Sequence, residues 1–229
     1  MTSITSSFVN LLYPNLCLIC GESLNTGEQQ LCLKCFHNIP KTNYHLQRDN
    51  PVEQHFWGKV RLERASSYFF FKKGSDFQHL IHELKYHGNQ EIGITLGRYA
   101  GADLLQSPDF SSVDCIVPVP LHEKKQAKRG YNQSELICRG LSEVMGKPVI
   151  TDNLYRCRES ATQTKKSVYE RYENMNGIFD LKNPMEFAGK HILIVDDVLT
   201  TGSTLEACIL ALYKAEDVKV SAFTLAVAS

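Results

Sequence analysis

The sequence has no excess of charge of either sign and no long hydrophobic run. Its 25 Lys and Arg residues balance 25 Asp and Glu residues, so no global field attracts nucleic acid or an anionic membrane. No apolar stretch approaches the roughly 18 residues that a membrane-spanning helix needs. The first residues, Met1 to Ile4, also lack the basic start and apolar core of a signal peptide. These absences predict a cytoplasmic protein without membrane insertion.

The eight cysteines are unevenly distributed. Four are scattered among apolar neighbours and are predicted to be small core residues. These are Cys115, Cys138, Cys157 and Cys208. The other four form two C-x-x-C pairs near the N-terminus, at Cys17, Cys20, Cys32 and Cys35. Two such pairs complete a tetrahedron of thiolates that suits Zn²⁺, and four sulfur ligands leave no open position, so the predicted zinc is structural. A disulfide pair is the alternative.

We therefore predict two parts, a small zinc-ribbon-like module over residues 1–44 and a larger domain over residues 45–229. A chain of 229 residues is long enough for one α/β domain and such a module. A module this small needs its metal to stay folded. The cysteines alone do not decide whether the module binds DNA, binds a protein or packs on its own chain; we expect packing.

One stretch near the C-terminus combines a strand, two acids, a tight loop and a helix. Residues 192–195 are aliphatic, which is typical of a strand buried on both faces in a parallel sheet. Asp196 and Asp197 follow directly. Small hydroxylated residues around Gly202 then lead into an apolar helix at 205–212.

The start of that helix is a candidate anion site. Ser203 and Glu206 have the spacing of a capping box, and Gly202 lets a phosphate approach the free backbone N–H groups closely. A P-loop nucleotide hydrolase also ends a strand with acids, but the G-x-x-x-x-G-K-[ST] motif that it requires is absent. A purely structural turn, in which Asp197 and Thr200 cap the helix, is the alternative. It leaves the repulsion between two neighbouring acids unexplained.

The rest of the chain predicts an α/β domain with a parallel sheet flanked by helices. Strands are expected at 60–71, 113–119 and 218–227, and helices at 76–88, 92–105 and 134–145. The strand at 113–119 ends in prolines, and a basic loop at 121–133 follows it. Ligands bind beyond the carboxyl ends of strands in open α/β sheets, so this loop is a second candidate anion site. A polar, mobile flap is expected at 155–167.

Residues 192–204 resemble the fingerprint of type I phosphoribosyltransferases, which bind phosphoribosyl pyrophosphate (PRPP). Further motifs make nearly the whole chain similar to the ComF family. They are the C-x-x-C pairs, Lys85-Tyr86-His87-Gly88, Val117-Pro118-Val119-Pro120, Arg129-Gly130-Tyr131-Asn132-Gln133 and Arg171-x-x-Asn174-x-x-Gly177-x-Phe179. Members of that family are described as amidophosphoribosyltransferase-like, and some are linked to DNA uptake in competent bacteria. The resemblance implies a type I phosphoribosyltransferase fold.

The resemblance also implies roles for particular residues. Asp196 and Asp197 would bind the ribose hydroxyls, and the loop after them would hold the 5′-phosphate. By position, the basic loop would contact pyrophosphate, and Mg²⁺ would bridge pyrophosphate and ribose oxygens. The loop residues are Thr200, Thr201, Gly202, Ser203 and Thr204, and the cations are Lys124, Lys125, Lys128 and Arg129. The flap around residues 162–163 and 171 would form a hood over the site.

The expected function is a phosphoribosyl transfer from PRPP to an unidentified acceptor, with Asp196 and Asp197 at the catalytic centre. The sequence contains no added domain for making ammonia from glutamine, which argues against a literal amidotransferase. The alternative is a non-catalytic PRPP sensor that binds single-stranded DNA or a competence protein. A stretch of aromatic residues interleaved with cations is compatible with it, although Phe56 and Trp57 could instead pack the two parts together. The stretch comprises Tyr44, His45, Phe56, Trp57, Lys59 and Arg61.

Overall fold

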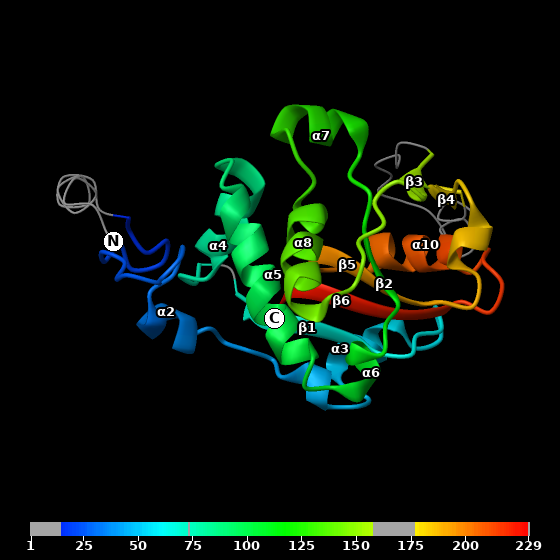
Figure 1. Cartoon of the computed structure of the whole chain (residues 1–229), viewed down its shortest axis with the longest axis horizontal. Helices are drawn as coiled ribbons and strands as arrows, with labels where there is room; N and C mark the ends of the chain where they lie inside the picture. The colour runs from blue at the N-terminus through cyan, green and yellow to red at the C-terminus, as the bar shows by residue number, and fades with distance from the viewer. Residues whose placement is uncertain (1–14, 73, 158–176, 229) are drawn as a thin grey trace.

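The computed structural model describes residues 15–72, 74–157 and 177–228. Its centre is a parallel four-stranded sheet in the order β1-β6-β5-β2 (Figure 1), which confirms the predicted α/β class. The strands are β1 (Ala65–Phe71), β2 (Cys115–Pro118), β5 (His191–Leu199) and β6 (Lys219–Ala228). Because β5 pairs with β2 on one side and β6 on the other, it is an interior strand.

Strand β5 is buried on both faces, as its aliphatic run predicts. Ile192 and Ile194 belong to one apolar cluster, whereas Leu193 and Val195 belong to the other, and all four side chains are fully buried. This alternation is the period-two pattern of a strand. The strand continues past the two acids and remains paired with β6 as far as Leu199.

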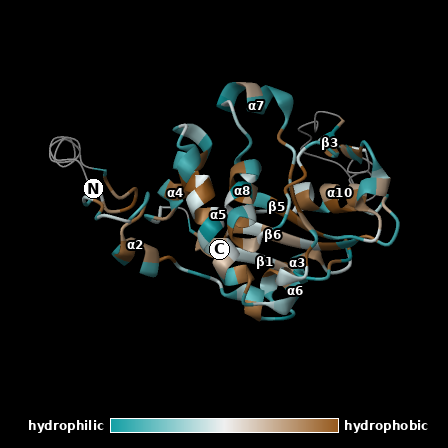
Figure 2. Ribbon diagram, in the orientation of Figure 1, coloured by the Kyte–Doolittle hydropathy of each residue, from teal (hydrophilic) through white to brown (hydrophobic). Residues whose placement is uncertain are grey.

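Helices cover both faces of the sheet (Figure 1). One face carries α4 (Gln78–Tyr86), α5 (Gln90–Leu104) and α8 (Gln133–Met145), and the other carries α10 (Ser203–Leu212). Figure 2 shows α10 as mainly hydrophobic, in keeping with its burial. Helices α5 and α8 approach each other so closely at Gly97 and Gly140 that a side chain at Gly97 would collide with the Ile137 carbonyl.

Shorter elements connect these layers. They are α2 (Leu33–His37), η1 (Tyr44–Leu46), α3 (Pro51–Phe56), α6 (Pro108–Ser111), α7 (Glu123–Arg129), β3 (Leu154–Arg156), β4 (Phe179–Leu181) and η2 (Pro184–Phe187). β3 and β4 pair antiparallel as a separate two-stranded sheet. Only residues 155–157 of the predicted flap are among the described residues, so residues 162–163 and 171 lie outside them. Within the described ranges, no helix has the length and apolar character needed to cross a bilayer.

The N-terminal segment packs against its own chain. Leu31 and three of the four clustered cysteines are buried in the same apolar core as α5 and α8. Phe36 packs on Tyr99 of α5 with 4.4 Å between ring centroids, and Lys41 pairs with Asp103 at 2.9 Å. The cysteine-rich segment therefore contributes to the core rather than standing apart from it.

The basic segment at 121–133 contains a helix, so the prediction of a loop is wrong. His122 caps α7 because its Nδ1 accepts a hydrogen bond from the Lys124 backbone N–H at 3.2 Å, and Gly130 ends the helix with a φ of +80°. The acid in the first turn and the cations in the last turn suit the helix dipole. The capping residues His122 and Gly130 are visible in the sequence, but the run of charged residues between them favoured the prediction of a loop.

The predicted capping box of α10 is also wrong. The N-cap is Gly202, and no side chain caps this helix, which also removes the alternative of a cap by Asp197 or Thr200. Ser203 is the first helical residue, so its hydroxyl is not at the position that a capping box requires. Glu206 instead pairs with Lys59 at 3.0 Å.

Candidate functional site

The two acids lie at the carboxyl edge of the sheet and contact two other elements. The Asp196 carboxylate accepts hydrogen bonds from the Ser134 hydroxyl of α8 at 3.1 Å and from the Asp197 N–H at 2.8 Å. Asp197 pairs with Lys85 of α4, with 3.0 Å between Oδ2 and Nζ. Both acids are partly buried. Residues far apart in the sequence therefore hold the acidic pair.

Burial, together with the charge of Asp197, raises the pKa of Asp196 to about 7. Hydrogen bonds from the Asp197 N–H and Ser134 and the charge of Lys85 act in the opposite direction. Asp196 therefore changes protonation near neutral pH, and a cation or a ligand that donates hydrogen bonds would favour its charged form.

The two strands that flank β5 end at different points beside the acids. The pairing with β2 ends where Pro118 lies opposite Val195, whereas the pairing with β6 continues to Leu199. Pro118 and Pro120 lack the N–H group that a longer ladder would need. The pairing with β2 thus ends at the prolines, just before the acidic pair.

The loop after β5 has the features of an anion site. Thr200, Thr201, Ser203 and Thr204 are all exposed. Gly202 adopts a φ of +70°, a conformation that favours glycine, and α10 begins directly after it. The first N–H groups of a helix have no partner within the helix. This loop can therefore present N–H groups and hydroxyls to a phosphate.

A histidine that no sequence pattern identifies supports this loop. His55 of α3 lies within hydrogen-bonding distance of the Thr201 carbonyl, with 2.9 Å from Nε2 to oxygen. A Cβ at Gly202 would lie only 2.6 Å from the same nitrogen and 3.4 Å from Phe56. No local motif marks His55, because it lies 146 residues before its partner.

The basic candidates are placed differently from the acids. Lys124, Lys125 and Lys128 are exposed on α7, which stands out beyond the ends of α4 and α8 (Figure 1). Arg129 is partly buried; it donates a hydrogen bond to Gln133 at 2.8 Å and its guanidinium lies 5.4 Å from the centre of the Tyr86 ring. Arg129 thus contacts the end of α4, the helix that also carries Lys85.

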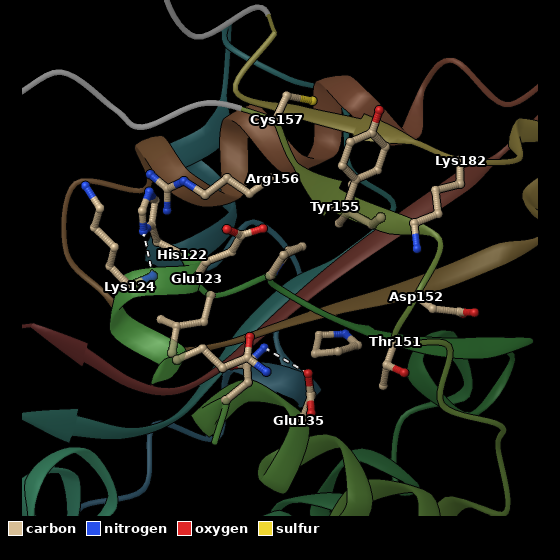
Figure 3. Close-up of a pocket in the computed structure, with 16 residues that line it drawn as sticks. His122, Glu123, Lys124, Glu135, Thr151, Asp152, Tyr155, Arg156, Cys157 and Lys182 are labelled. Carbon is tan, nitrogen blue, oxygen red and sulfur yellow. Dashed lines mark hydrogen bonds between the residues drawn. The ribbon is translucent and has the colours of Figure 1, made fainter. Parts of the chain in front are cut away.

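A cavity of about 600 Å³ opens beside this edge of the sheet (Figure 3). Glu135 lines it and directly follows Ser134, which contacts Asp196, but neither Asp196 nor Asp197 is among the residues that line the cavity. Cys157 is exposed and lines the cavity as well, so the prediction that it is a core residue is wrong. The volume is in the range of small-molecule sites.

The charged side chains of this cavity balance one another. Its cations are Lys124, Arg156 and Lys182, and its acids are Glu123, Glu135 and Asp152. In Figure 3 the Lys182 amine and the Glu123 carboxylate lie on opposite sides of the opening. Pro118, Pro120 and Leu154 add apolar surface. The cavity therefore suits a small polar molecule without a large net charge better than a polyanion.

The four N-terminal cysteines form a second candidate site, as predicted. Their sulfur atoms all lie within 4.8 Å of one another, and within the described ranges this is the one such group of His, Cys, Asp or Glu ligands. The Cys20 and Cys32 sulfurs are 3.7 Å apart, close to the ~3.8 Å that tetrahedral Zn–S bonds of about 2.3 Å require. Burial alone would raise the pKa of Cys17, but backbone N–H groups lower it to about 7. This donor set fits a metal ion such as zinc.

Comparison with known proteins agrees with this geometry. Residues 127–228 match the phosphoribosyl transferase domain family. This segment includes the acidic pair, the loop after it and the strands β5 and β6 of the parallel sheet, in accordance with the predicted phosphoribosyltransferase fold.

Similar proteins extend the match toward the N-terminus. DNA utilization protein YhgH of Escherichia coli K12 is 32% identical over 199 residues, which cover 83% of this chain and 80% of that protein. Competence protein F of Haemophilus influenzae is 32% identical over 198 residues, which cover 82% of this chain and 86% of that protein. A solved glutamine PRPP amidotransferase from B. subtilis is 19% identical with a TM-score of 0.38; the match covers 57% of this chain and spans 25% of that one.

Proposed function

Because the chain belongs to the ComF family, together with competence protein F and YhgH, we propose that it binds PRPP with Mg²⁺ and transfers phosphoribosyl to an acceptor. The observation that carries this proposal is the acidic pair in the last part of β5, followed by a left-handed glycine and a helix N-terminus. Carboxylates accept hydrogen bonds from ribose hydroxyls, and backbone N–H groups bind a phosphate. A site for a phosphorylated ribose requires both the carboxylates and the backbone N–H groups.

In this proposal each part of the site has one task. Asp196 and Asp197 hold the ribose 2′- and 3′-hydroxyls, and the loop from Thr200 to Thr204 holds the 5′-phosphate. The cations of α7 face the pyrophosphate. Mg²⁺ supplies charge neutralisation for the pyrophosphate and, as a hard ion that takes oxygen ligands, is compatible with carboxylates beside it.

The protein needs to supply little covalent chemistry for this reaction. Phosphoribosyl transfer breaks the bond between ribose C1 and the pyrophosphate oxygen through an oxocarbenium-like state, as glycosyl transfers generally do. The chain contributes by positioning the ribose and by stabilising the charge of the leaving group. The cavity lined by Glu135, the residue after Ser134, is our candidate for the acceptor site.

Calorimetric titration of PRPP with Mg²⁺ tests the binding step. We expect saturable binding to the intact chain and much weaker binding to Asp196→Asn and Asp197→Asn. Undiminished binding in both variants, or none in the intact chain, would contradict the site assignment. Pyrophosphate release with a panel of acceptors then tests turnover.

We also propose that the four cysteines hold one structural Zn²⁺. Four thiolates at tetrahedral spacing leave no position for a substrate, and the segment is buried in the core. Metal analysis of the purified chain should give one zinc per molecule. A chain that carries no zinc yet retains its thermal stability would contradict this assignment.

The second candidate function is a PRPP sensor that binds single-stranded DNA. The names of the relatives favour it, and Trp57 is 59% exposed close to Arg61 in the sequence. Other members of the predicted stacking surface are less available, because Phe56 and His45 are buried and Lys59 pairs with Glu206. Trp57 is therefore the residue on which this alternative depends.

The salt dependence of DNA binding separates the two functions. If the alternative holds, affinity for single-stranded DNA falls steeply with salt and falls again in Trp57→Ala. Point variants are preferable to removal of residues 1–44, since that segment contributes buried residues to the core. A flat salt response and an unchanged Trp57→Ala variant would argue against the alternative.

A further inference from the structure

Lys85 is a cation that contacts the acidic pair directly. It is the second-last residue of α4, and its Nζ lies 3.0 Å from Asp197 Oδ2. The side chains of Lys85 and Asp197 are only 22% and 13% exposed. A lysine on an ordinary surface would keep its ammonium in water, whereas this one is turned inward against a proposed ligand-binding acid.

The end of α4 is held in place by the segment that leads into α8. The Tyr131 hydroxyl donates a hydrogen bond to the Leu84 carbonyl at 2.8 Å. The Arg129 guanidinium lies over the Tyr86 ring. The two residues flanking Lys85 in the sequence are thus both anchored, and the same segment carries Ser134, which contacts Asp196. Lys85 is therefore fixed relative to both acids.

With the ribose hydroxyls on the two acids, the geometry of PRPP would bring its pyrophosphate toward this ammonium. In the α-anomer the pyrophosphate on C1 and the 2-hydroxyl on C2 lie on the same face of the ribose ring. A cation paired with a carboxylate that binds the ring hydroxyls is consequently within reach of the pyrophosphate oxygens. Those oxygens carry more negative charge than a single carboxylate and form strong charge-assisted hydrogen bonds with lysine.

We propose that Lys85 is a PRPP-binding residue that contacts the pyrophosphate group and so selects PRPP over ribose 5-phosphate. This inference rests on the proposed PRPP site. It assigns the inner pyrophosphate contact to α4, in addition to the exposed lysines of α7. When PRPP binds, the Lys85 ammonium exchanges its contact with Asp197 for one with the pyrophosphate, which leaves the Asp197 carboxylate for the ribose.

Three ligands separate this role from a structural one. Calorimetry on the full chain with Mg²⁺ would compare PRPP, inorganic pyrophosphate and ribose 5-phosphate in the intact protein and in Lys85→Gln. Because a hydrogen bond to a charged group contributes about 1.5–3 kcal/mol, we expect PRPP and pyrophosphate to bind about tenfold or more weakly to the variant. Ribose 5-phosphate affinity should change less than about threefold, since that ligand has no pyrophosphate.

Two further variants control for loss of charge and loss of fold. Lys214→Gln removes a different lysine from an exposed pair with Asp180 and should leave all three affinities unchanged. Lys85→Arg keeps the charge and should restore part of the PRPP affinity. Circular dichroism and thermal unfolding would confirm that each variant is folded.

The outcomes distinguish this inference from the function on which it rests. If the intact chain binds PRPP but Lys85→Gln binds PRPP and pyrophosphate normally, the role of Lys85 is refuted and the PRPP site stands. Equal weakening of all three ligands would likewise refute pyrophosphate selection. If the intact chain does not bind PRPP, the proposed function fails, and the role of Lys85 fails with it.

Discussion

The acidic pair and helix α7 bring opposite charges to the same edge of the sheet, but the fold holds them very differently. Asp196 and Asp197 are partly buried and contact α8 and α4 through Ser134 and Lys85. Three lysines of α7 are exposed, and the helix itself has no buried residue. Figure 2 shows α7 as mainly hydrophilic.

This difference predicts how much each region contributes to ligand binding. A side chain fixed by its neighbours loses little conformational entropy when a ligand arrives, whereas an exposed lysine loses more and is screened by salt. The acidic pair should therefore determine whether a ligand binds, and α7 should adjust affinity and rate.

Asp197→Asn should weaken PRPP binding by about 100-fold, because the variant loses both a charged acceptor and the partner that positions Lys85. Calorimetry at constant Mg²⁺ measures the change. The division between the two regions would be wrong if neutralising three lysines of α7 weakened PRPP binding more than this single substitution.

Gly202→Ala should lower the free energy of unfolding by about 2–3 kcal/mol, since the added Cβ meets His55 in a backbone conformation that disfavours alanine. Gly189→Ala is the matched control. Gly189 has a φ of +67° but nothing within 4 Å of an added Cβ, so only the conformational cost of about 1 kcal/mol remains. Urea unfolding measures both, and equal losses would show that the His55 contact is unimportant.

Asp196→Asn should stabilise the protein at high pH. The folded pKa of Asp196 is raised to about 7, above the unfolded value of about 4, so the folded chain binds more protons between these values. The free energy of unfolding of the natural protein therefore falls as pH rises from about 4 to 7. Asn does not titrate, so the variant does not lose stability in this way. Its free energy of unfolding should exceed that of the natural protein by about 1–3 kcal/mol above pH 8.

Below pH 4 the difference between Asp196→Asn and the natural protein should disappear, because Asp196 is then protonated in both the folded and the unfolded chain. Urea unfolding at a series of pH values measures the difference. Parallel curves for the two proteins across the whole range would show that Asp196 titrates normally.

Neutralising α7 should have the smallest effect. The triple variant K124Q/K125Q/K128Q should weaken PRPP binding about three- to tenfold, with a loss that shrinks at high salt, because exposed charges contribute little and are screened. Calorimetry at two salt concentrations measures this. A loss that does not depend on salt would mean that these lysines contact the ligand directly.

Local patterns predicted the centre of the fold well. The aliphatic run at 192–195 identified the buried strand because a strand in the middle of a parallel sheet is apolar on both faces. Gly202 after the acids marked the tight turn, and the cysteine spacing identified the four-sulfur cluster. In each case the signal lies within a few residues of the structure that it specifies.

Local sequence patterns do not predict the contacts that complete the site. Lys85 and Asp197, and likewise His55 and Thr201, meet only because the chain folds back on itself. No periodicity links residues in separate elements. The helical form of α7 was missed for another reason, since four cations in a short segment resemble a solvated loop although the capping residues were present.

A crystal structure with PRPP and Mg²⁺ is the most direct test of the central claim that the acidic pair binds the ribose. We expect both ribose hydroxyls within about 2.6–3.2 Å of the Asp196 and Asp197 carboxylates, with the 5′-phosphate on the loop from Thr200 to Thr204. PRPP bound in the cavity lined by Glu123 and Lys182, with its ribose away from the acids, would contradict it.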